Sequence, residues 1–304
     1  MDLRQLEMFL AIAEAGSFTA AGDKLHVSQS AVSRQIALLE EELHGKVFKR
    51  IHRRTLLTPV GEVLLRHARK VFHDLREASV EVSEVLQLRR GSLRLGGGMS
   101  VSSYLFPPLL KQYRALNPQI EISIAVGTNE EILRQLRANS VDLALLSLPF
   151  SDPDLAVTPA VEEEMVLVTA RNHPLTRKRK VRARDVAPYP FINFEPGSNT
   201  RKVITSFFEQ EGVNLHNSME IENVEIIRRF VEIGLGVAIL PLQSIVVGER
   251  RSRAVWYTRF TGRKITRQMG WVHLRSDFLP ATMREMLRIF AEMRPQLYPS
   301  SSGK

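Results

Sequence analysis

The first quarter of the chain places hydrophobic residues at helical spacing. A first helix is predicted by apolar positions that recur every three or four residues, namely Leu3, Leu6, Phe9, Leu10 and Ala13. A second, short helix is predicted after Ser17, whose hydroxyl can accept hydrogen bonds as its N-cap. A third is predicted after Ser28, and its buried stripe is Val32, Ile36, Leu39 and Leu43. Only His26 and Val27 separate the second and third helices, so the chain must turn a sharp corner there.

The face opposite this stripe is suited to DNA bases. It carries Gln29, Ser30, Ser33, Arg34 and Ala37, and no acidic residue precedes Glu40. Gln and Arg can pair with base edges in a major groove, and small Ser side chains permit close approach. A solvated amphipathic helix in some other domain is the alternative, because a helix-turn-helix pattern alone is a weak signal.

A basic segment follows the third helix. Between Lys46 and Thr58, apolar Val47, Phe48 and Ile51 alternate with basic residues, which predicts a two-stranded wing with cationic tips. Helix, helix and wing together favour DNA binding. We expect Gln29, Ser33 and Arg34 to contact bases. The residues expected on phosphates or in a minor groove are Ser28, Ser30, Lys49, Arg50, Arg53 and Arg54.

Residues 1–61 resemble the N-terminal winged helix of LysR-type transcriptional regulators. Two ungapped stretches carry the resemblance, LRQLEMFLAIAEAGSFTAAGDKLHVSQSAVSRQIALLEEELHGKVFKR and LTPVG. Ser30 stands where many members have proline, which should cost rigidity and not function. The resemblance implies a sequence-specific regulator that binds double-stranded DNA at an interrupted palindrome. It also implies control by a small-molecule effector, RNA polymerase as a candidate partner, and a homotetramer built as a dimer of dimers.

A long helix is predicted after Pro59, because no Pro or Gly interrupts the chain between Glu62 and Arg90. Its apolar residues recur at alternating intervals of four and three, the spacing of a heptad seam. A monomer offers nothing obvious to cover so long a stripe, so we expect an antiparallel dimer contact; packing on its own domain is the alternative. The seam residues are Leu64, Ala68, Val71, Leu75, Ala78, Val82 and Val85.

Beyond residue 90 the pattern changes to alternating strands and helices. Strands at 93–98, 120–126 and 141–147, with helices at 103–116 and 129–138, predict a βαβαβ unit with a parallel sheet. A second α/β unit follows. Its strands are expected at 165–170, 189–194, 219–221, 235–240, 254–258 and 265–274, its helices at 199–211 and 223–233, and a last helix at 279–294.

Two such halves, joined by crossings near 160–165 and 262–268, resemble a periplasmic-binding-protein-like effector domain. The predicted fold class is therefore α plus α/β. We expect a winged helix-turn-helix domain at 1–58, a linker and dimerisation helix at 59–90, and an effector-binding domain at 91–304. Within the last, subdomain I covers about 91–161 and 266–304, and subdomain II about 162–265.

Ligands in such folds lie where strand ends face helix starts. Hydroxyl and amide side chains recur there in both halves, and helix N-termini favour oxyanions, so we expect a small organic anion as effector. Each of these side chains could equally be an ordinary N-cap. The candidates are Ser100, Ser102, Ser103, Thr128, Asn129, Ser198, Asn199, Arg201 and Asn223.

Composition and motifs narrow the function further. The net charge is +9, yet residues 1–90 carry 14 Lys and Arg against 12 Asp and Glu, so bulk basicity does not by itself indicate DNA binding. The RKRK run at 177–180 is read as a solvated loop rather than a second DNA contact. The absence of cysteine excludes disulfides and thiol chemistry.

An enzyme finds little support in the sequence. It holds no dinucleotide-binding or P-loop fingerprint, His67 and His73 do not share a helical face as metal ligands would, and Glu162 to Glu164 read as a charged crossing segment. We therefore expect no enzymatic activity, cofactor or metal. The chain begins with an amphipathic helix instead of a signal segment, which indicates a cytoplasmic protein without a membrane partner. The alternative is a solute-binding or enzymatic α/β protein with an appended helical domain.

Overall fold

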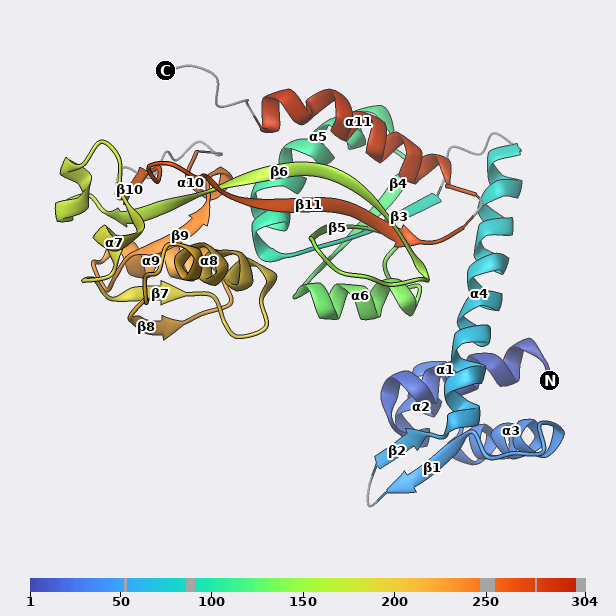
Figure 1. Ribbon diagram of the computed structural model, residues 1–304. Coiled ribbons are helices and arrows are strands. Elements are labelled where there is room, and N and C mark those ends of the chain that lie inside the picture. The colour runs from blue at the N-terminus through green and yellow to red at the C-terminus, as the bar shows by residue number, and fades with distance from the viewer. Residues whose placement is uncertain (52–53, 86–90, 247–254, 277, 299–304) are drawn as a thin grey trace. The chain divides into compact units, whose positions relative to one another are not determined.

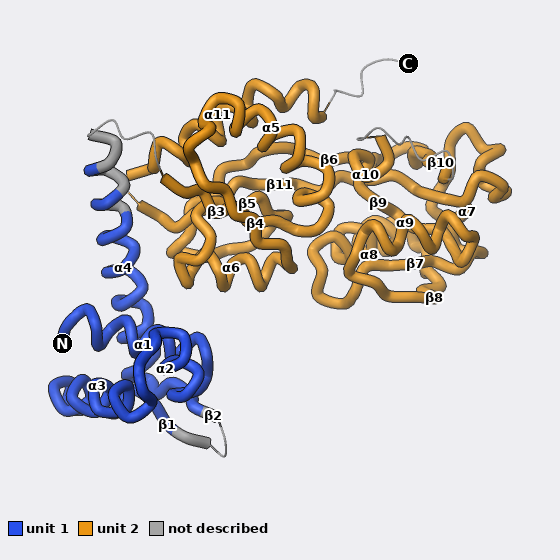
Figure 2. The backbone as a smooth tube through the Cα atoms, turned by 180° about the vertical axis from the view of Figure 1, so that it is seen from behind, with its two compact units in different colours: residues 1–85 blue, residues 86–304 orange. Residues whose placement is uncertain are grey.

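The computed structural model describes residues 1–51, 54–85, 91–246, 255–276 and 278–298. The chain divides into two compact units, residues 1–85 and 86–304 (Figures 1 and 2). The long helix that we expected as a separate linker belongs to the first unit.

The first unit contains the predicted helices and wing. Its elements are α1 (Leu3–Ala15), α2 (Phe18–Leu25), α3 (Gln29–Glu42), β1 (Phe48–Ile51), β2 (Arg54–Leu57) and α4 (Pro59–Val85), with β1 and β2 antiparallel. Both predicted N-caps are confirmed, because Ser17 Oγ accepts from the Ala20 amide and Ser28 Oγ from the Ala31 amide, at 3.5 and 3.2 Å. The predicted stripe of α3 is buried at Val32, Ile36 and Leu39 and half-buried at Leu43.

The corner between α2 and α3 depends on a glycine. A Cβ at Gly22 would lie 2.7 Å from the carbonyl oxygen of Val27, closer than any side chain tolerates. His26 ends α2 in the left-handed region with φ 54°. The chain can therefore turn back onto α2 only because position 22 has no side chain.

Helix α4 corrects part of the predicted dimer seam. Leu64 and Ala68 are buried in the core of the first unit, together with residues of α1 and α3. They are therefore not free to contact a partner. Further along, Val71, Leu75 and Val82 are 36%, 44% and 58% exposed, and Ala78 is exposed too. The side chain of Val85 and residues 86–90 lie outside the described part of the chain.

Among its described residues, the second unit is built on one seven-stranded sheet. The strand order is β10 (Val255–Thr258), β6 (Leu155–Ala170), β11 (Ile265–Leu274), β5, β3 and β4, and β9 (Ala238–Pro241) pairs with β6. In its first half, β3 (Gly91–Gly97) lies parallel to β4 (Ile120–Val126) and β5 (Leu143–Ser147), as predicted. One face packs on α5 (Phe106–Leu116) and α11 (Ala281–Leu297), the other on α6 (Asn129–Arg137). Where a helix was expected from residue 103, a π-helical turn, η1 (Val101–Leu105), leads into α5.

Two long strands join the halves. β11 (Ile265–Leu274) pairs antiparallel over its whole length with residues 155–165 of β6 (Leu155–Ala170), and the two strands run side by side from one half to the other (Figure 1). Ala160 and Met269 pack in the core of the first half, whereas Met165 and Ile265 pack in that of the second. β6 starts ten residues before the predicted strand, because the crossing segment is itself part of the sheet.

The second half surrounds the far ends of these strands. Its short strands are β7 (Phe191–Asn193), β8 (Asn217–Glu220), β9 (Ala238–Pro241) and β10 (Val255–Thr258), and β7 and β8 form a separate parallel pair. Its helices are η2 (Pro174–Arg177), α7 (Ala183–Val186), α8 (Asn199–Gln210), α9 (Val224–Glu232) and α10 (Gln243–Val246).

Candidate functional site

Most of the outer face of α3 is exposed to solvent. Gln29, Ser30 and Arg34 are exposed and Ser33 is half-buried. Within the described residues, the side chains of Gln29 and Arg34 make no hydrogen bond or ion pair, which leaves both available to base edges. Ser28 caps the helix, and its hydroxyl also lies 3.0 Å from that of Ser30.

The wing is held against the helices by packing and by one carboxylate. The Phe48 ring contacts those of Phe9 and Phe18, with centroids 5.2 and 5.7 Å apart. Glu40, near the end of α3, accepts hydrogen bonds from the amides of Val47 and Phe48, at 3.0 and 3.4 Å. Helix α3 and the wing are thereby joined directly.

Only some residues of the predicted basic cluster in the wing belong to the described part of the chain. Glu40 pairs with Lys46 at 2.7 Å, so that lysine is not a free cation, whereas Lys49 is exposed. Arg53 and the side chains of Arg50 and Arg54 lie outside the described residues, so their expected phosphate contacts remain predictions.

The second unit holds a cleft of about 460 Å³ between its two halves. The starts of η1, α6, α8 and α9 line it. Six of the nine candidates from the sequence lie there: Ser100, Thr128, Asn129, Ser198, Asn199 and Asn223. The topology therefore brings together side chains that are far apart in the chain.

Three candidates lie elsewhere. Ser102 belongs to the turn η1, where its hydroxyl donates to the Gly97 carbonyl at 3.5 Å, and Ser103 is exposed on the same turn. Arg201, expected to bind an anion, donates instead to Glu220 and to the Phe194 carbonyl, at 2.6 and 3.0 Å. It lines a neighbouring depression and not the cleft.

The ordinary N-cap explanation holds for two candidates. Thr128 Oγ1 accepts from the Glu131 amide at 3.2 Å, and Asn223 Oδ1 accepts from the amides of Glu225 and Ile226 at 2.9 and 3.2 Å. Ser100 and Ser198 make no side-chain cap. Asn129 and Asn199 come from opposite halves, yet both Nδ2 groups donate to the Ser147 carbonyl, at 2.6 and 3.0 Å.

An ion pair at the cleft wall was not predicted from the sequence. Arg267 on β11 and Glu163 on β6 are direct neighbours in the strand register and are 6% and 4% exposed. The Arg267 Nε donates to Glu163 at 3.0 Å, and its other nitrogens donate to Thr200 Oγ1 at 2.7 Å and Ser100 Oγ at 3.3 Å. Glu163 is therefore a buried ion-pair partner within the charged crossing segment expected at Glu162 to Glu164.

Four glutamates also line the cleft: Glu130, Glu131, Glu195 and Glu222. Partial burial and the neighbouring carboxylates of Glu195 and Glu131 raise the pKa of Glu222. Hydrogen bonds from the Thr128 amide and hydroxyl lower the pKa of Glu131. Because the charges of Glu195 and Glu131 both act on Glu222, the three carboxylates lie close enough to interact electrostatically within the cleft.

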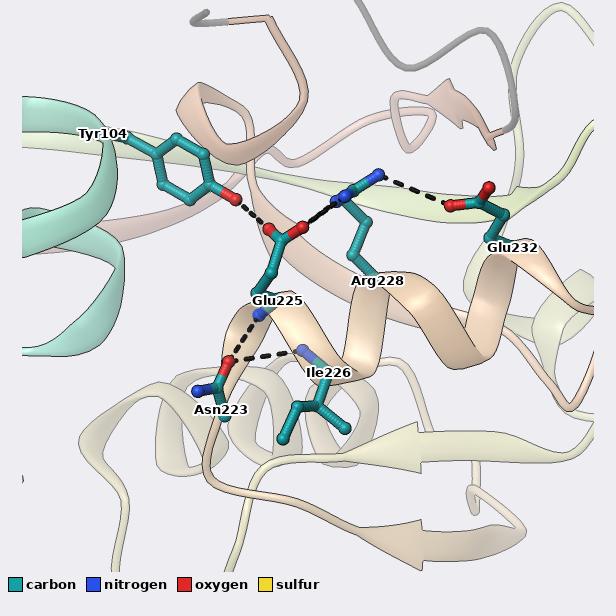
Figure 3. Close-up of polar contacts among 6 residues, drawn as sticks. All are labelled: Tyr104, Asn223, Glu225, Ile226, Arg228 and Glu232. Carbon is teal, nitrogen blue, oxygen red and sulfur yellow. Dashed lines mark hydrogen bonds and ion pairs between the residues drawn. The ribbon is translucent and has the colours of Figure 1, made fainter. Parts of the chain in front are cut away.

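A further polar contact joins the two halves (Figure 3). The Tyr104 hydroxyl, on η1, donates to the carboxylate of Glu225, in the first turn of α9. Arg228 donates to the other Glu225 oxygen through Nε at 3.1 Å and lies 3.6 Å from Glu232. Its hydrogen bond is the main reason that the pKa of Glu225 is lowered, whereas burial raises that of Tyr104.

No helix in the part of the chain that the structure describes is long and apolar enough to span a membrane. The same residues contain no group of three or more His, Cys, Asp or Glu side chains arranged to hold a metal ion.

Two family models match the chain. Residues 3–62 match the bacterial regulatory helix-turn-helix protein of the lysR family, and residues 86–294 match the LysR substrate binding domain. The transcriptional activator CmpR of Synechocystis sp. is 32% identical over 81% of this chain and 80% of its own length. The transcriptional regulator CfxR of Cupriavidus necator is 31% identical over 92% and 87%.

Solved structures share the fold of the whole chain. A full-length OxyR variant from Pseudomonas aeruginosa superposes with a TM-score of 0.75 at 24% identity, covering 97% of this chain and 95% of that one. Full-length CbnR in complex with its target DNA gives a TM-score of 0.66 at 20% identity, covering 96% and 99%.

Proposed function

The chain belongs to the LysR family of DNA-binding transcriptional regulators, and we propose that it responds to a small-molecule effector bound in the cleft of its second unit. The observation that carries the DNA-binding role is the outer face of α3, where Gln29 and Arg34 are exposed opposite a buried stripe. The observation that supports the effector site is the convergence of four helix starts on one cleft.

The DNA contacts follow from the chemistry of each surface. Gln29, Ser33 and Arg34 are assigned to base edges, and Ser28, Ser30 and Lys49 to the sugar-phosphate backbone. CbnR, which shares this fold, is solved bound to its target DNA. The wing arginines Arg50, Arg53 and Arg54 are assigned to the backbone on sequence alone.

We also propose that the exposed part of the α4 stripe pairs two chains. Val71, Leu75, Ala78 and Val82 follow one another at heptad spacing and are exposed in the single chain. Two recognition helices related by such a pairing would read an interrupted palindrome, and a dimer of dimers through the second units is the proposed assembly. RNA polymerase remains a proposed partner, and the cytoplasm the proposed site of action.

Effector binding would act through the strands that join the halves. Ligand in the cleft contacts both halves, and β6 and β11 are the paired crossings about which those halves can rotate. We place the two halves at about 91–161 with 266–304, and at about 162–265. A ligand that binds one angle between the halves better than another shifts their equilibrium.

Fluorescence anisotropy with duplexes from the protein's own promoter tests the regulator role. We expect at least about 10³-fold preference for that promoter over a shuffled duplex of equal length at near-physiological salt. Equal affinity for both duplexes would contradict sequence-specific regulation. An enzyme or a pure solute-binding protein predicts such equality, and the homologous regulators argue against both.

A further inference from the structure

The charges that line the cleft indicate which chemical class of small molecule it binds. This inference rests on the proposed function, in which the cleft binds the effector. Four glutamates line the cleft, and Arg267 is the one cationic side chain among the described residues that surround it. The charge of Arg267 is matched by its buried partner Glu163. The cleft is therefore left with an excess of negative charge.

Two of these glutamates differ from the other pair in lacking a compensating partner among the described residues. Glu130 pairs with Arg134 at 3.2 Å, and Glu131 accepts from the Thr128 amide at 2.8 Å within its own helix start. Over the same part of the chain, the side chains of Glu195 and Glu222 have no hydrogen-bond or ion-pair partner. The raised pKa of Glu222 has a related origin, since burial and the other carboxylates act on it without a cation between them.

An independent observation points to a ligand at the same place. Ser147, the last residue of β5, lines the cleft and is only 6% exposed, and its hydroxyl has no hydrogen-bond partner within the described residues. Asn129 and Asn199 occupy its carbonyl and leave the hydroxyl unused. Buried hydroxyls are nearly always hydrogen-bonded, so a group that fills the cleft is the natural partner for this one.

We propose that the effector carries a protonated amine, which the carboxylates of Glu195 and Glu222, both on the second half, bind together at one side of the cleft. An ammonium has three donors and no acceptor, so it can satisfy two carboxylates at once through charge-assisted hydrogen bonds. Its remaining polar groups reach Ser147 and the start of α8, where Ser198 makes no side-chain cap. A ligand with an amine at one end and a carboxylate at the other fits both features.

This proposal replaces the simple organic anion expected from helix N-termini alone. The starts of α6 and α9 are already capped by Thr128 and Asn223, which removes part of their attraction for an anion. A dicarboxylate would add two negative charges beside Glu131, Glu195 and Glu222. Only the amine end turns that repulsion into attraction.

Isothermal titration calorimetry on the full chain tests the proposal with three probes of equal length: succinate, 4-aminobutanoate and 1,4-diaminobutane. We expect at least one of the two amines to bind, and succinate to bind at least about 10-fold more weakly. Glu222→Gln and Glu195→Gln should each weaken amine binding about 10-fold or more. Glu209→Gln, the same change at an exposed position on α8, is the matched control and should leave amine binding unaltered.

Charge reversal sharpens the test. Glu222→Lys should abolish amine binding and raise the affinity for succinate, and thermal denaturation verifies that the position tolerates the change. The proposal is overturned if succinate binds more tightly than both amines, if neither amine binds at millimolar concentration, or if the Gln variants bind like the parent protein. Promoter preference is measured without probe, so loss of the amine proposal and loss of the regulator role are separate results.

Discussion

The Tyr104 hydroxyl donates a hydrogen bond to the Glu225 carboxylate and so ties the first half of the second unit to the second half. Arg228 holds the other oxygen of that carboxylate, which fixes its orientation toward the tyrosine (Figure 3). The Ser147 carbonyl, which accepts from Asn129 and Asn199, and Arg267, which donates to Glu163 and Thr200, also connect the two halves at the cleft.

Removal of the tyrosine hydroxyl should loosen the second unit. Tyr104→Phe keeps the ring but leaves Glu225 with only its arginine, so we expect the free energy of unfolding to fall by about 1–2 kcal/mol in urea denaturation. Tyr257→Phe removes a hydroxyl for which the described residues offer no hydrogen bond and serves as control. Equal losses from the two variants would mean that the Glu225 contact contributes nothing.

The buried ion pair should be costly to break on one side. Arg267→Met leaves the Glu163 carboxylate buried without its cation, and we expect a loss of about 3–5 kcal/mol of unfolding free energy. Adding Glu163→Gln should recover a large part of that loss, because the uncompensated charge is then gone. If the double variant is no more stable than the single one in the same urea titration, the loss comes from packing and not from charge.

The helix-turn-helix corner should reject the smallest side chain. Gly22→Ala puts a methyl group against the Val27 carbonyl oxygen, and we expect it to cost about 1–3 kcal/mol although alanine favours helices. Ala20→Gly, at an exposed position of the same helix, tests the opposite change and should cost only about 1 kcal/mol. Thermal denaturation of the two variants side by side gives the order; a neutral Gly22→Ala would contradict the close approach.

Substitutions at the residues assigned to bases and at those assigned to the DNA backbone should affect DNA binding in different ways. Arg34→Ala should reduce the preference for the promoter over shuffled duplex by about 10- to 100-fold, because a bidentate base contact is lost. Lys49→Ala should weaken both duplexes alike and lower the slope of log affinity against log salt by about 1. Anisotropy titrations at several salt concentrations measure both effects, and identical profiles for the two variants would contradict the assigned roles.

A charge within the exposed stripe of α4 should dissociate the proposed dimer. Leu75→Glu would bury a carboxylate in the pairing surface, so we expect sedimentation at micromolar concentration to show a smaller species. Val63→Glu changes a similarly exposed apolar residue of the same helix that lies off the stripe, and it should leave the assembly intact. Dissociation by both, or by neither, would place the contact elsewhere.

Local patterns were enough to predict the helices and wing of the first unit and the longer helices and strands of the second, but not the short helices η2, α7 and α10. The caps Ser17 and Ser28 and the stripe of α3 each depend on residues a few positions apart, which a sequence displays directly. Where prediction failed, the sequence did not reveal the register between paired strands or a second residue that competes for the same side chain. Arg267 meets Glu163 across 104 positions, and only the pairing of β6 with β11 makes them neighbours.

Smaller errors have similarly physical causes. The π-helical turn begins two residues before the predicted helix, so Ser100 lines the cleft whereas Ser102 and Ser103 do not. Arg201 is occupied by Glu220 of β8, a contact that no local pattern reveals. Leu64 and Ala68 fit the heptad spacing, but the same spacing also suits the helix's own domain, which buries them.

Glu40 couples the position of the wing to that of α3 in the first unit. Its carboxylate, carried by α3, holds two backbone amides at the start of the wing, and the Phe48 ring seats that strand on α1. A rotation of α3 would therefore move the wing with it, and a rotation of the wing would move α3. If α3 and the wing contact DNA as proposed, the distance between their two contacts is fixed by this joint, and a change of operator would have to come from exchanged side chains on each surface.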